Sequence, residues 1–537
     1  MPVLCLKVGE ELHRISFEPG PSIRDILETS NYRVRSGCHG IGACGLCRVR
    51  IISGAVTAPT LSDQIHLSAE QLAAGVRLAC QVRPRRDLCI EILNPAVESR
   101  WRMSPEGVFQ RNARKAVLPA GRLPADVKRP CGVAIDIGTT NLCLSLYDLA
   151  DGRWLTDRWG PNPQAEFGAD VLTRLTAAAA SASAARAMSE QVVNAIQDAL
   201  LDIASREGID LRRVVDVRIV GNTAMLALLS GKHYEWLLQP ERWTAPLDCA
   251  PDSTASWVAE WGIHPRATVQ VVAPLAGFVG SDLLAGLVAV RFTQGRVPAL
   301  FVDFGTNSEI ALWDGKTLWV TAAAGGPAFE RSGIRHAVPA EPGAVFRVTC
   351  ENGAEPFDYR IIGDDRAKGL CGSGLIDLIA CLLKSGTLST VGKFSGGAAE
   401  FTFSIAGTSM SLTRKDIDVL QRAKAAMGVG MRALCETAAV RMEDLQRVCV
   451  AGVFGRFLDV PNAQAIGLLP AVAPENVELV GNAALAGCCD VLLSVHAAEH
   501  LERMRDMARV INLAGYPHFD EAFLECLYLR PLRIGEP

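Results

Sequence analysis

Apolar and polar residues alternate along residues 2–8 and again along 12–18, on either side of a turn at Gly9. Alternation with a period of two predicts a β-hairpin that turns one face toward a core. The segment SIRDILETS that follows has the spacing and the opening serine of a short helix, and RVRII further along returns to strand character. The first 93 residues therefore predict a small domain in which a hairpin, a helix and further strands form one sheet.

Two later segments share a different pattern. CGVAIDIGTTNLCLSLYDL and PALFVDFGTNSEIALWDG each run from an apolar strand through a Gly-Thr turn into an alternating strand. Each segment opens a region of mixed strand and helix character, so the repetition predicts a duplicated α/β unit. We place its two halves at residues 131–295 and 296–537.

Composition and charge narrow the function classes. Hydrophobic residues make up 49% of the 537 residues and charged residues 21%, which are proportions of a globular chain and exclude wholesale disorder. The 54 basic and 58 acidic side chains nearly balance, which argues against a nucleic-acid partner bound by bulk charge. No apolar run reaches the roughly 18–20 residues that span a membrane. The 17 cysteines are scattered and odd in number, which favours the reducing cytoplasm.

Four cysteines differ from the others in their spacing. SGCHGIGACGLCRVRI places Cys38, Cys44 and Cys47 on one loop, and LACQVRP adds Cys80 after a gap of 32 residues. Three thiolates on one loop with a distant fourth match the ligand plan of a plant-type 2Fe–2S cluster. The glycines among them let a loop wrap closely around a cluster and direct backbone N–H groups at its sulfurs. These four cysteines are the predicted metal ligands.

Two alternatives stay open at this site. One is a zinc site, although zinc knuckles favour two C-x2-C pairs and this loop contains one. The other is Cys89 as the fourth ligand, but Cys89 lies in the alternating strand DLCIEIL, where core packing is the commoner role. With its strand and helix order the segment resembles the ferredoxins that have five residues in the first gap. That resemblance implies a β-grasp fold and a role in electron transfer.

Between the two parts, residues 94–130 lose all periodicity. Prolines recur and basic residues outnumber acidic ones, as in a linker. The linker is either a solvated tether or a hinge that lets the cluster domain move between an electron donor and an acceptor. One-electron transfer needs close approach, which a flexible linker permits with two partners in turn.

The repeated hairpin carries the residues of a phosphate site. In each copy an Asp ends the first strand, where it can hold Mg²⁺ or a water bound to it. The Gly-Thr turn then brings backbone N–H groups and hydroxyls to phosphate oxygens. One such turn is a weak signal, but two copies 167 residues apart are a strong one. The predicted residues are Asp136, Gly138, Thr139, Thr140 and Asn141 in the first copy and Asp303, Gly305, Thr306 and Asn307 in the second.

The duplicated hairpin resembles that of the acetate kinase, sugar kinase, Hsp70 and actin superfamily, which implies two RNase H-like halves that close on MgATP. RVCVAGVFGRFLD then resembles an adenosine motif with Gly452 and Gly455 at a helix start, and GNAALAGCCDVLL resembles a connecting hinge helix. KGLCGSGLIDLIACLL places Gly372 and Gly374 at a further helix N-terminus, suited either to anions or to tight packing. Asp282, in APLAGFVGSDLLAGL, either positions an attacking water or caps its helix, the commoner use.

Taken in order, the motifs resemble those of the ATP-dependent reductive activators of corrinoid proteins. They are the cluster loop, DIGTTN, VGNTAML, PLAGFVGSD, VDFGTNSEI, GLCGSGLID and AGVFGRF. The resemblance implies an enzyme that uses ATP to pass one electron from the cluster to the inactive Co(II) corrinoid of a methyltransferase system, restoring Co(I). It also implies a low-potential cellular electron donor and a homodimer. The corrinoid should belong to the partner, because this chain lacks the D-x-H-x-x-G motif.

Two other functions fit part of the pattern. An activator of 2-hydroxyacyl-CoA dehydratases shares the ATPase fold, but it holds a 4Fe–4S cluster between two subunits and lacks a ferredoxin domain. A small-molecule kinase with a redox-sensing domain would turn over a small acceptor rather than respond to a protein. The expected fold class is α/β multidomain: a β-grasp ferredoxin domain at 1–93, a flexible linker at 94–130, and a duplicated RNase H-like ATPase at 131–295 and 296–537.

Overall fold

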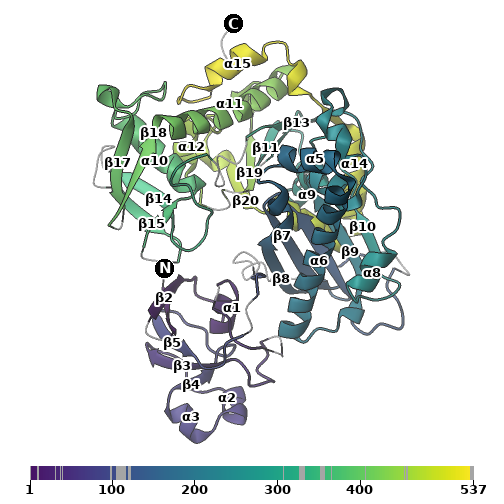
Figure 1. The fold of residues 1–537 in the computed structure, drawn as a ribbon, viewed down its shortest axis with the longest axis vertical. Helices are drawn as coiled ribbons and strands as arrows, with labels where there is room; N and C mark the ends of the chain where they lie inside the picture. Colours follow the sequence, from purple (N-terminus) through teal and green to yellow (C-terminus); the bar gives the residue numbers. More distant parts are fainter. Residues whose placement is uncertain are drawn as a thin grey trace.

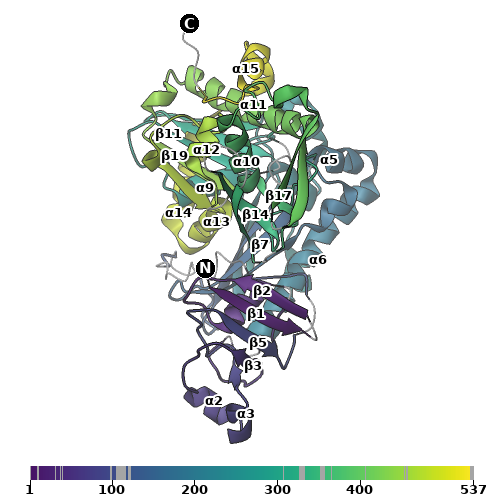
Figure 2. The ribbon, with the colours of Figure 1, turned by 90° about the vertical axis from the view of Figure 1, so that its left-hand side faces the viewer.

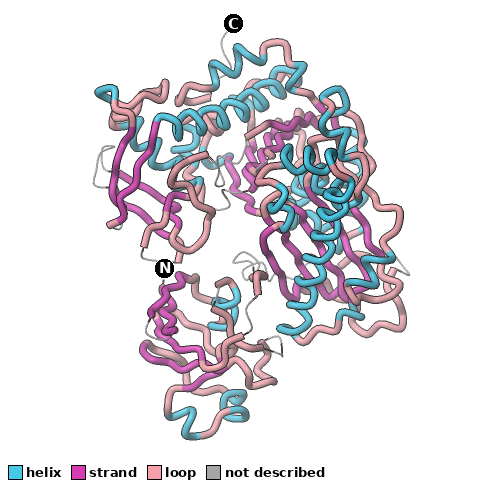
Figure 3. Tube along the Cα trace, in the orientation of Figure 1, coloured by secondary structure: helices cyan, strands magenta, loops and turns pink. Residues whose placement is uncertain are grey.

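The computed structural model has a small N-terminal domain joined to two larger α/β halves (Figure 1). It describes residues 2–8, 11–30, 32–36, 38, 40–96, 99–103, 116–118, 122–305, 307–325, 333–350, 357–363, 366–405, 407–452, 454 and 457–532. Figure 3 shows the strands of each part gathered into sheets with helices around them. Within the described ranges, no helix combines the length and the apolar character that a membrane crossing requires.

The N-terminal domain has the β-grasp arrangement that the alternating pattern predicts. Its five-stranded sheet has the order β2-β1-β5-β3-β4, in which β1 pairs antiparallel with β2 and parallel with β5. The helix α1 begins after Ser22, which forms a reciprocal capping box with Asp25. The predicted turn at Gly9 lies outside the described residues. The elements are β1 (Val3–Val8), β2 (Glu11–Ser16), α1 (Ile23–Glu28), β3 (Arg48–Ser53), α2 (Leu61–His66), α3 (Ala69–Ala73), β4 (Val76–Leu78) and β5 (Leu88–Ile92).

The middle domain is a sheet in the order β10-β9-β6-β7-β8. Its first three strands are antiparallel, and β9 and β10 add parallel strands beside β6. Apolar side chains of α6 and α7 pack on one face of this sheet, and those of α9 and α13 pack on the other. The elements are β6 (Cys131–Ile137), β7 (Asn141–Asp148), β8 (Trp154–Pro161), α5 (Val171–Ala180), α6 (Ala182–Glu207), β9 (Val214–Gly221), α7 (Thr223–Ser230), α8 (Ala255–Glu260), β10 (Thr268–Val271) and α9 (Ser281–Ala289).

The C-terminal half repeats this topology, which confirms the duplicated α/β fold. Its sheet has the order β20-β19-β11-β12-β13-β21, with an antiparallel β11-β12-β13 meander and parallel β19 and β20 beside β11. Its elements are β11 (Ala299–Phe304), β12 (Ser308–Trp313), β13 (Leu318–Ala323), α11 (Arg414–Thr437), β19 (Arg447–Gly452), α12 (Val460–Ala465), β20 (Val477–Gly481), α13 (Ala483–Leu493), α14 (Val495–Met507), β21 (Ala508–Val510) and α15 (Phe519–Cys526).

Between β13 and α11 the C-terminal half carries an inserted unit. A three-stranded sheet of order β15-β14-β16 supports α10, and the hairpin β17-β18 leads into α11. The inserted elements are β14 (Ala344–Cys350), β15 (Phe357–Ile361), β16 (Gly369–Leu370), α10 (Gly372–Lys384), β17 (Glu400–Ile405) and β18 (Thr408–Thr413).

Two helices cross where the two halves meet. α9 ends the middle domain, and α13 is the connecting helix predicted from GNAALAGCCDVLL. A Cβ added at Gly487 of α13 would overlap the carbonyl oxygen of Ala285 in α9, so only glycine allows this close crossing. Apolar side chains of both helices belong to one buried cluster that also includes strands of both halves.

The described parts of the linker do not behave as a free tether. Arg102 exchanges two backbone hydrogen bonds with Trp159 at 2.8 and 2.9 Å, which adds a bridge to the edge of the middle sheet. Trp101 and Met103 are buried on either side of it. Val117 likewise exchanges hydrogen bonds with the end of α13 and the start of α14. Burial of the apolar side chains of Trp101 and Met103 stabilises the contact at Arg102, and the proline-rich pattern of this segment did not predict it.

Candidate functional site

The four predicted cluster ligands lie close together. Cys38, Cys44 and Cys47 belong to the loop between α1 and β3, and Cys80 follows β4. A backbone hydrogen bond of 2.7 Å from Ala79 to Cys47 joins the two segments. The side chain of Cys38 contacts that of Cys44, and the side chain of Cys47 contacts that of Cys80. The sulfurs therefore form two pairs, one half-buried and one buried.

Hydrogen bonds converge on these thiols. Burial opposes ionisation of Cys38, but hydrogen bonds from Cys44 and from neighbouring backbone N–H groups hold its pKa below the usual value. A hydrogen bond from Cys47 lowers the pKa of Cys80 to about 7. Gln81 adds a contact of 3.4 Å from its Nε2 to the Cys80 Sγ. The contact with Cys80, together with burial, raises the pKa of Cys47. The hydrogen bonds therefore favour the thiolate, which is the form that binds metal, at Cys38 and Cys80 and not at Cys47.

These residues fit a two-iron cluster. The loop backbone comes so close to its surroundings that a Cβ at Gly42 would lie 2.5 Å from Ser62 Oγ, and Gly42 has a φ of +84°. A 2Fe–2S cluster takes four cysteine thiolates, and the two sulfur pairs suit two irons. Among the described residues, no three His, Cys, Asp or Glu side chains surround a single metal position. Cys89 lies elsewhere, paired across strands with Cys5.

A second group of functional side chains lies where the two halves meet. We call Asp136, Asp282, Asp303 and Glu309 the acidic centre. Asp136 comes from β6, Asp282 from the first turn of α9, and Asp303 and Glu309 from β11 and β12. Glu309 is buried, whereas the other three keep part of their side chains exposed. The charges of Asp282 and Asp303 both act on Glu309, and that of Asp282 acts on Asp136.

Burial and mutual repulsion shift the acidic centre toward its protonated forms. Burial and the charge of Asp282 raise the pKa of Asp136 to about 7. Burial raises the pKa of Asp282 to about 6, against hydrogen bonds from its own helix N-terminus. Burial and the charges of Asp282 and Asp303 raise the pKa of Glu309 well above its usual value. A bound divalent cation would relieve this repulsion, since carboxylates are ligands of Mg²⁺.

Asp282 does not cap its helix. The N-cap position of α9 is Gly280, and Asp282 lies in the first turn, where its Oδ1 accepts the N–H of Leu283 at 2.8 Å. The prediction that Asp282 is the N-cap of its helix is therefore wrong. Its side chain belongs to the acidic centre, and the alternative role, the positioning of a water, stays a prediction.

In both hairpin turns the glycine lies against a backbone carbonyl of its own turn, three residues on in the first and two residues on in the second. In the first, Gly138 donates to the Asn141 carbonyl at 2.9 Å, and a Cβ at Gly138 would lie 2.9 Å from that oxygen. In the second, a Cβ at Gly305 would lie 2.9 Å from the Asn307 carbonyl oxygen. Thr139 is buried and Thr140 exposed, so the first turn presents one hydroxyl outward. Thr306 lies outside the described residues.

The remaining predicted glycines have different positions. Gly452 ends β19 with a φ of +88°, and a Cβ there would lie 2.5 Å from Asp303 Oδ1, so the predicted adenosine motif adjoins the second hairpin. Among the described residues the next helix is α12, which starts at Val460 after the N-cap Asp459 and not at Gly452. Gly455 lies outside the described residues.

The glycines of α10 favour tight packing. Gly372 begins α10, and a Cβ at Gly374 would overlap the carbonyl oxygen of Val345 on β14. The Ser373 hydroxyl between them donates to the Phe346 carbonyl at 2.9 Å. The first turn of α10 is therefore pressed onto β14, which is the packing alternative. A contact of Gly372 and Gly374 with the nucleotide stays a prediction.

Sequence reasoning missed four residues of this site. Glu309 is one, and its signal is a glutamate inside an otherwise apolar strand. Asn222 Nδ2 lies 3.4 Å from Glu309 Oε1, and Asn482 Nδ2 lies 3.2 Å from Asp136 Oδ2. The buried Arg174 donates to the Thr139 carbonyl at 2.8 Å and fixes the first turn. Each asparagine is the N-cap of a helix, a role that concealed its second contact.

Three family models match successive parts of the chain. Residues 7–85 match the 2Fe-2S iron-sulfur cluster binding domain. Residues 131–295 match the RACo middle region, and residues 298–534 match the C-terminal domain of RACo, the ASKHA domain. These matches agree with a bound 2Fe–2S cluster and with an ATP-binding fold.

Known proteins resemble the chain along most of its length. The corrinoid activation enzyme RamQ of Eubacterium limosum is 31% identical over 73% of this chain and 69% of its own length. The Co(II) methylated amine-specific corrinoid protein reductase of Methanosarcina barkeri is 26% identical over 67% of this chain and 70% of its own. A solved structure of a reductive activator for corrinoid,iron-sulfur protein shares the fold, with a TM-score of 0.65, 24% identity and 99% of both chains covered.

Proposed function

The chain belongs to the family of corrinoid activation enzymes, and from this premise we propose that it uses ATP to drive one electron from its 2Fe–2S cluster to the Co(II) corrinoid of a partner methyltransferase protein. The product is the Co(I) form of the corrinoid. One observation carries the proposal: a single chain joins four convergent cysteines to a duplicated ATPase fold with carboxylates from both halves at its centre.

We assign the roles residue by residue. Cys38, Cys44, Cys47 and Cys80 hold the 2Fe–2S cluster, which supplies one-electron chemistry when bound. Their backbone and Gln81 hydrogen bonds stabilise the thiolate charge. The glycines of the cluster loop keep side chains away from the sulfurs.

The acidic centre and the hairpin turns serve MgATP. Asp136 and Asp303 are placed to hold Mg²⁺, and the turns at Gly138 and Gly305 to donate N–H groups to phosphate oxygens. Asp282 is proposed to orient the attacking water, because its carboxyl lies beside Asp136 and Glu309 in the acidic centre. Gly452 keeps side chains away from the nucleotide beside Asp303.

ATP is needed because the electron transfer is uphill for ordinary donors. Each 59 mV of shortfall costs about a factor of ten in a one-electron equilibrium. Closure of the two halves about α9 and α13 offsets this cost if the open and closed forms differ in affinity for the Co(II) and Co(I) partner. In this proposal, the difference between the open and closed forms of the protein couples ATP hydrolysis to electron transfer.

The partners follow from the same chemistry. The corrinoid is carried by the partner protein, and a low-potential cellular donor reduces the 2Fe–2S cluster between turnovers. We place the reaction in the cytoplasm, where its cysteines, which form no disulfide among the described residues, remain reduced. A homodimer is proposed as the working unit, and sedimentation at several concentrations tests it.

An anaerobic spectroscopic assay tests the function. The purified chain is mixed with a chemical reductant and a Co(II) corrinoid protein, and visible spectra follow Co(I) with and without MgATP. Co(I) formation that needs MgATP, and that is lost in Cys44→Ser and Asp303→Ala, is the expected result. Cys89→Ser is the matched control for the cysteine change. Co(I) formation independent of MgATP with several corrinoid proteins would refute the proposal.

A further inference from the structure

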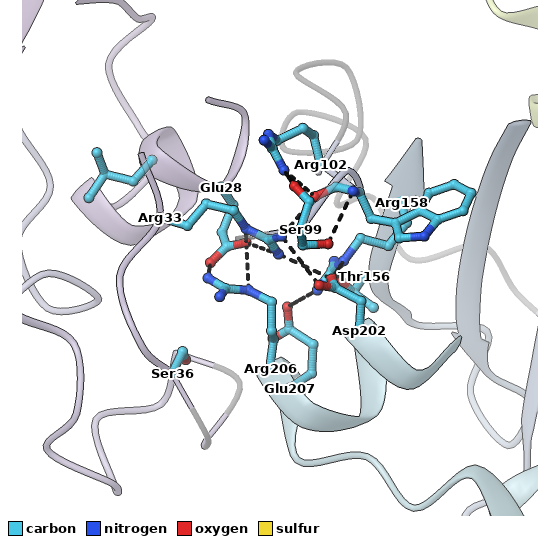
Figure 4. A network of polar contacts seen from close by, with 12 residues as sticks. Glu28, Arg33, Ser36, Ser99, Arg102, Thr156, Arg158, Asp202, Arg206 and Glu207 are labelled. Carbon is cyan, nitrogen blue, oxygen red and sulfur yellow. Dashed lines mark hydrogen bonds and ion pairs between the residues drawn. The ribbon is translucent and has the colours of Figure 1, made fainter. Parts of the chain in front are cut away.

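The ferredoxin domain is held against the end of α6 by buried ion pairs (Figures 2 and 4). Arg24 Nη2 lies 2.5 Å from Glu207 Oε2, and Arg33 Nη2 lies 3.1 Å from Asp202 Oδ2. Glu28 accepts from Arg33 at 2.7 Å and from Arg206 Nε at 3.0 Å. We call these residues, with their remaining neighbours, the docking network: Arg24, Asp25, Glu28, Arg33, Arg158, Asp202, Arg206 and Glu207.

The docking network is balanced in charge and buried. Four arginines face four acidic residues, and the exposed fraction of each side chain is 9% or less. Removing such charges from water costs nearly as much as their attraction returns. A small change in the charge on either side of this surface therefore shifts the equilibrium between the docked and the undocked ferredoxin domain.

Arg24 contacts both sides of this interface. On one side it pairs with Glu207 of α6. On the other it faces the 2Fe–2S loop, since a Cβ built at Gly40 would lie 3.6 Å from Arg24 Nη1, and its Nε donates to Ser36 Oγ at 3.0 Å. The same Cβ at Gly40 would lie 3.9 Å from the Cβ of Cys80, so Gly40 lies between the guanidinium and a cluster ligand. The guanidinium thus lies near a cluster ligand and contacts the neighbouring domain.

We propose that Arg24 couples the redox state of the ferredoxin domain to its docking on α6. When the domain is docked, the Glu207 carboxylate offsets the charge of Arg24. When it is undocked, Arg24 keeps the more distant Asp25, at 3.4 Å, but loses Glu207, so more of its charge acts on the cluster loop. The cluster takes one electron from a low-potential one-electron donor, and no bond is made or broken. The added electron is a negative charge, which Arg24 stabilises best in the undocked state.

The direction of the coupling follows from linkage. If undocking favours the added electron, then adding the electron favours undocking by the same factor. The ferredoxin domain therefore takes up an electron more easily while undocked and is the stronger reductant while docked. A tenfold difference in docking between the two redox states corresponds to 59 mV in the one-electron midpoint potential.

Potentiometry of the full-length 2Fe–2S protein, without ATP or a corrinoid partner, tests the coupling. Glu207→Gln releases Arg24 from its partner and should raise the midpoint potential. Arg24→Gln removes the cation and should lower it. Asp198→Asn is the control and should leave the midpoint potential unchanged. Asp198 lies on α6, as Glu207 does, but its carboxylate forms an exposed pair with Arg100.

Arg206→Glu separates coupling from simple electrostatics. Placing a negative charge near the ferredoxin domain would by itself lower the midpoint potential. The same change sets a second carboxylate against Glu28 and should undock the domain, which frees Arg24 and raises the potential. A rise in Arg206→Glu supports the proposal, and a fall overturns it. Because Arg206 lies in the middle domain, loading of the 2Fe–2S loop, checked by the visible spectrum, is left intact.

Hydrogen exchange provides a readout of docking itself. Amide exchange in α1 and at the end of α6 should be faster in the dithionite-reduced protein than in the oxidised protein, and this difference should vanish in Arg24→Gln. Equal exchange in both redox states of the unchanged protein would refute the coupling. This inference rests on the 2Fe–2S site of the proposed function. Neither measurement uses ATP or corrinoid, so a negative result here leaves the Co(I) assay to judge that function separately.

Discussion

Two buried groups of charged side chains contrast in this molecule. In the docking network every carboxylate meets an arginine, and although burial opposes its charge, Arg158 and Arg33 hold the pKa of Asp202 below its usual value. In the acidic centre burial and the charge of Asp282 raise the pKa values of Asp136 and Glu309, and asparagine amides that hydrogen-bond to both carboxyls oppose the rise. The paired group holds two domains together. The acidic group is left short of positive charge, which is what the Mg²⁺ ion of a bound nucleotide would bring.

The largest effect is expected where a paired charge loses its partner. Glu28→Ala leaves Arg206 buried without its carboxylate, while Arg33 keeps Asp202, and breaking such a pair costs about 3–5 kcal/mol. We expect the ferredoxin domain to undock, which hydrogen exchange at the end of α6 measures. Glu91→Ala, in an exposed pair with Arg50 of the same domain, is the control and should cost at most about 1 kcal/mol. Unchanged exchange in Glu28→Ala would show that the network does not hold the domain.

The next effect concerns activity rather than docking. Asp303→Asn removes a proposed Mg²⁺ ligand, and ATP hydrolysis should fall by roughly 10²–10³, as when a preorganised electrostatic contact is lost. The visible spectrum of the 2Fe–2S cluster should not change. Asp252→Asn, at an exposed pair with Lys232, should hydrolyse ATP at the unchanged rate. Normal hydrolysis by Asp303→Asn would remove the acidic centre from the ATP site.

The pH response should separate the two groups. The pKa of Asp136 is raised to about 7, so its proton competes with Mg²⁺ below that pH. Mg²⁺-dependent nucleotide binding should strengthen up to about tenfold per pH unit on approach to pH 7 and level off above it. For the same reason this carboxyl stabilises the metal-free fold at low pH, and that stability is lost as the pH rises toward 7. Calorimetric titration between pH 5.5 and 8 measures the binding, and Asp136→Asn should flatten the profile.

The smallest effect is expected where burial already opposes the charge. Burial and the charges of Asp282 and Asp303 raise the pKa of Glu309 well above its usual value, which favours the neutral carboxyl, and glutamine is neutral and has nearly the same shape. Glu309→Gln should therefore change the free energy of unfolding by less than about 1 kcal/mol, which the urea midpoint and slope measure. A loss as large as that of Glu28→Ala would mean that Glu309 is paired and ionised.

Much of the fold and of the cluster site could be predicted because their signals are local. The spacing of Cys38, Cys44 and Cys47 predicts a loop that gathers three thiolates, and the fourth follows a short strand. The two hairpin turns are each encoded within a few residues. Glu309 and Arg174 were missed because a single polar residue in an apolar element gives no periodic signal.

By itself the sequence determined the order of the domains, the duplicated hairpins and the chemistry of the cluster loop. Local spacing decides which backbone turns form and which side chains share a loop. Tertiary structure alone decided how the ferredoxin domain lies on α6, because Arg24 and Glu207 are 183 residues apart. Such charges are paired only when two folded surfaces meet, and burial then decides whether each stays ionised.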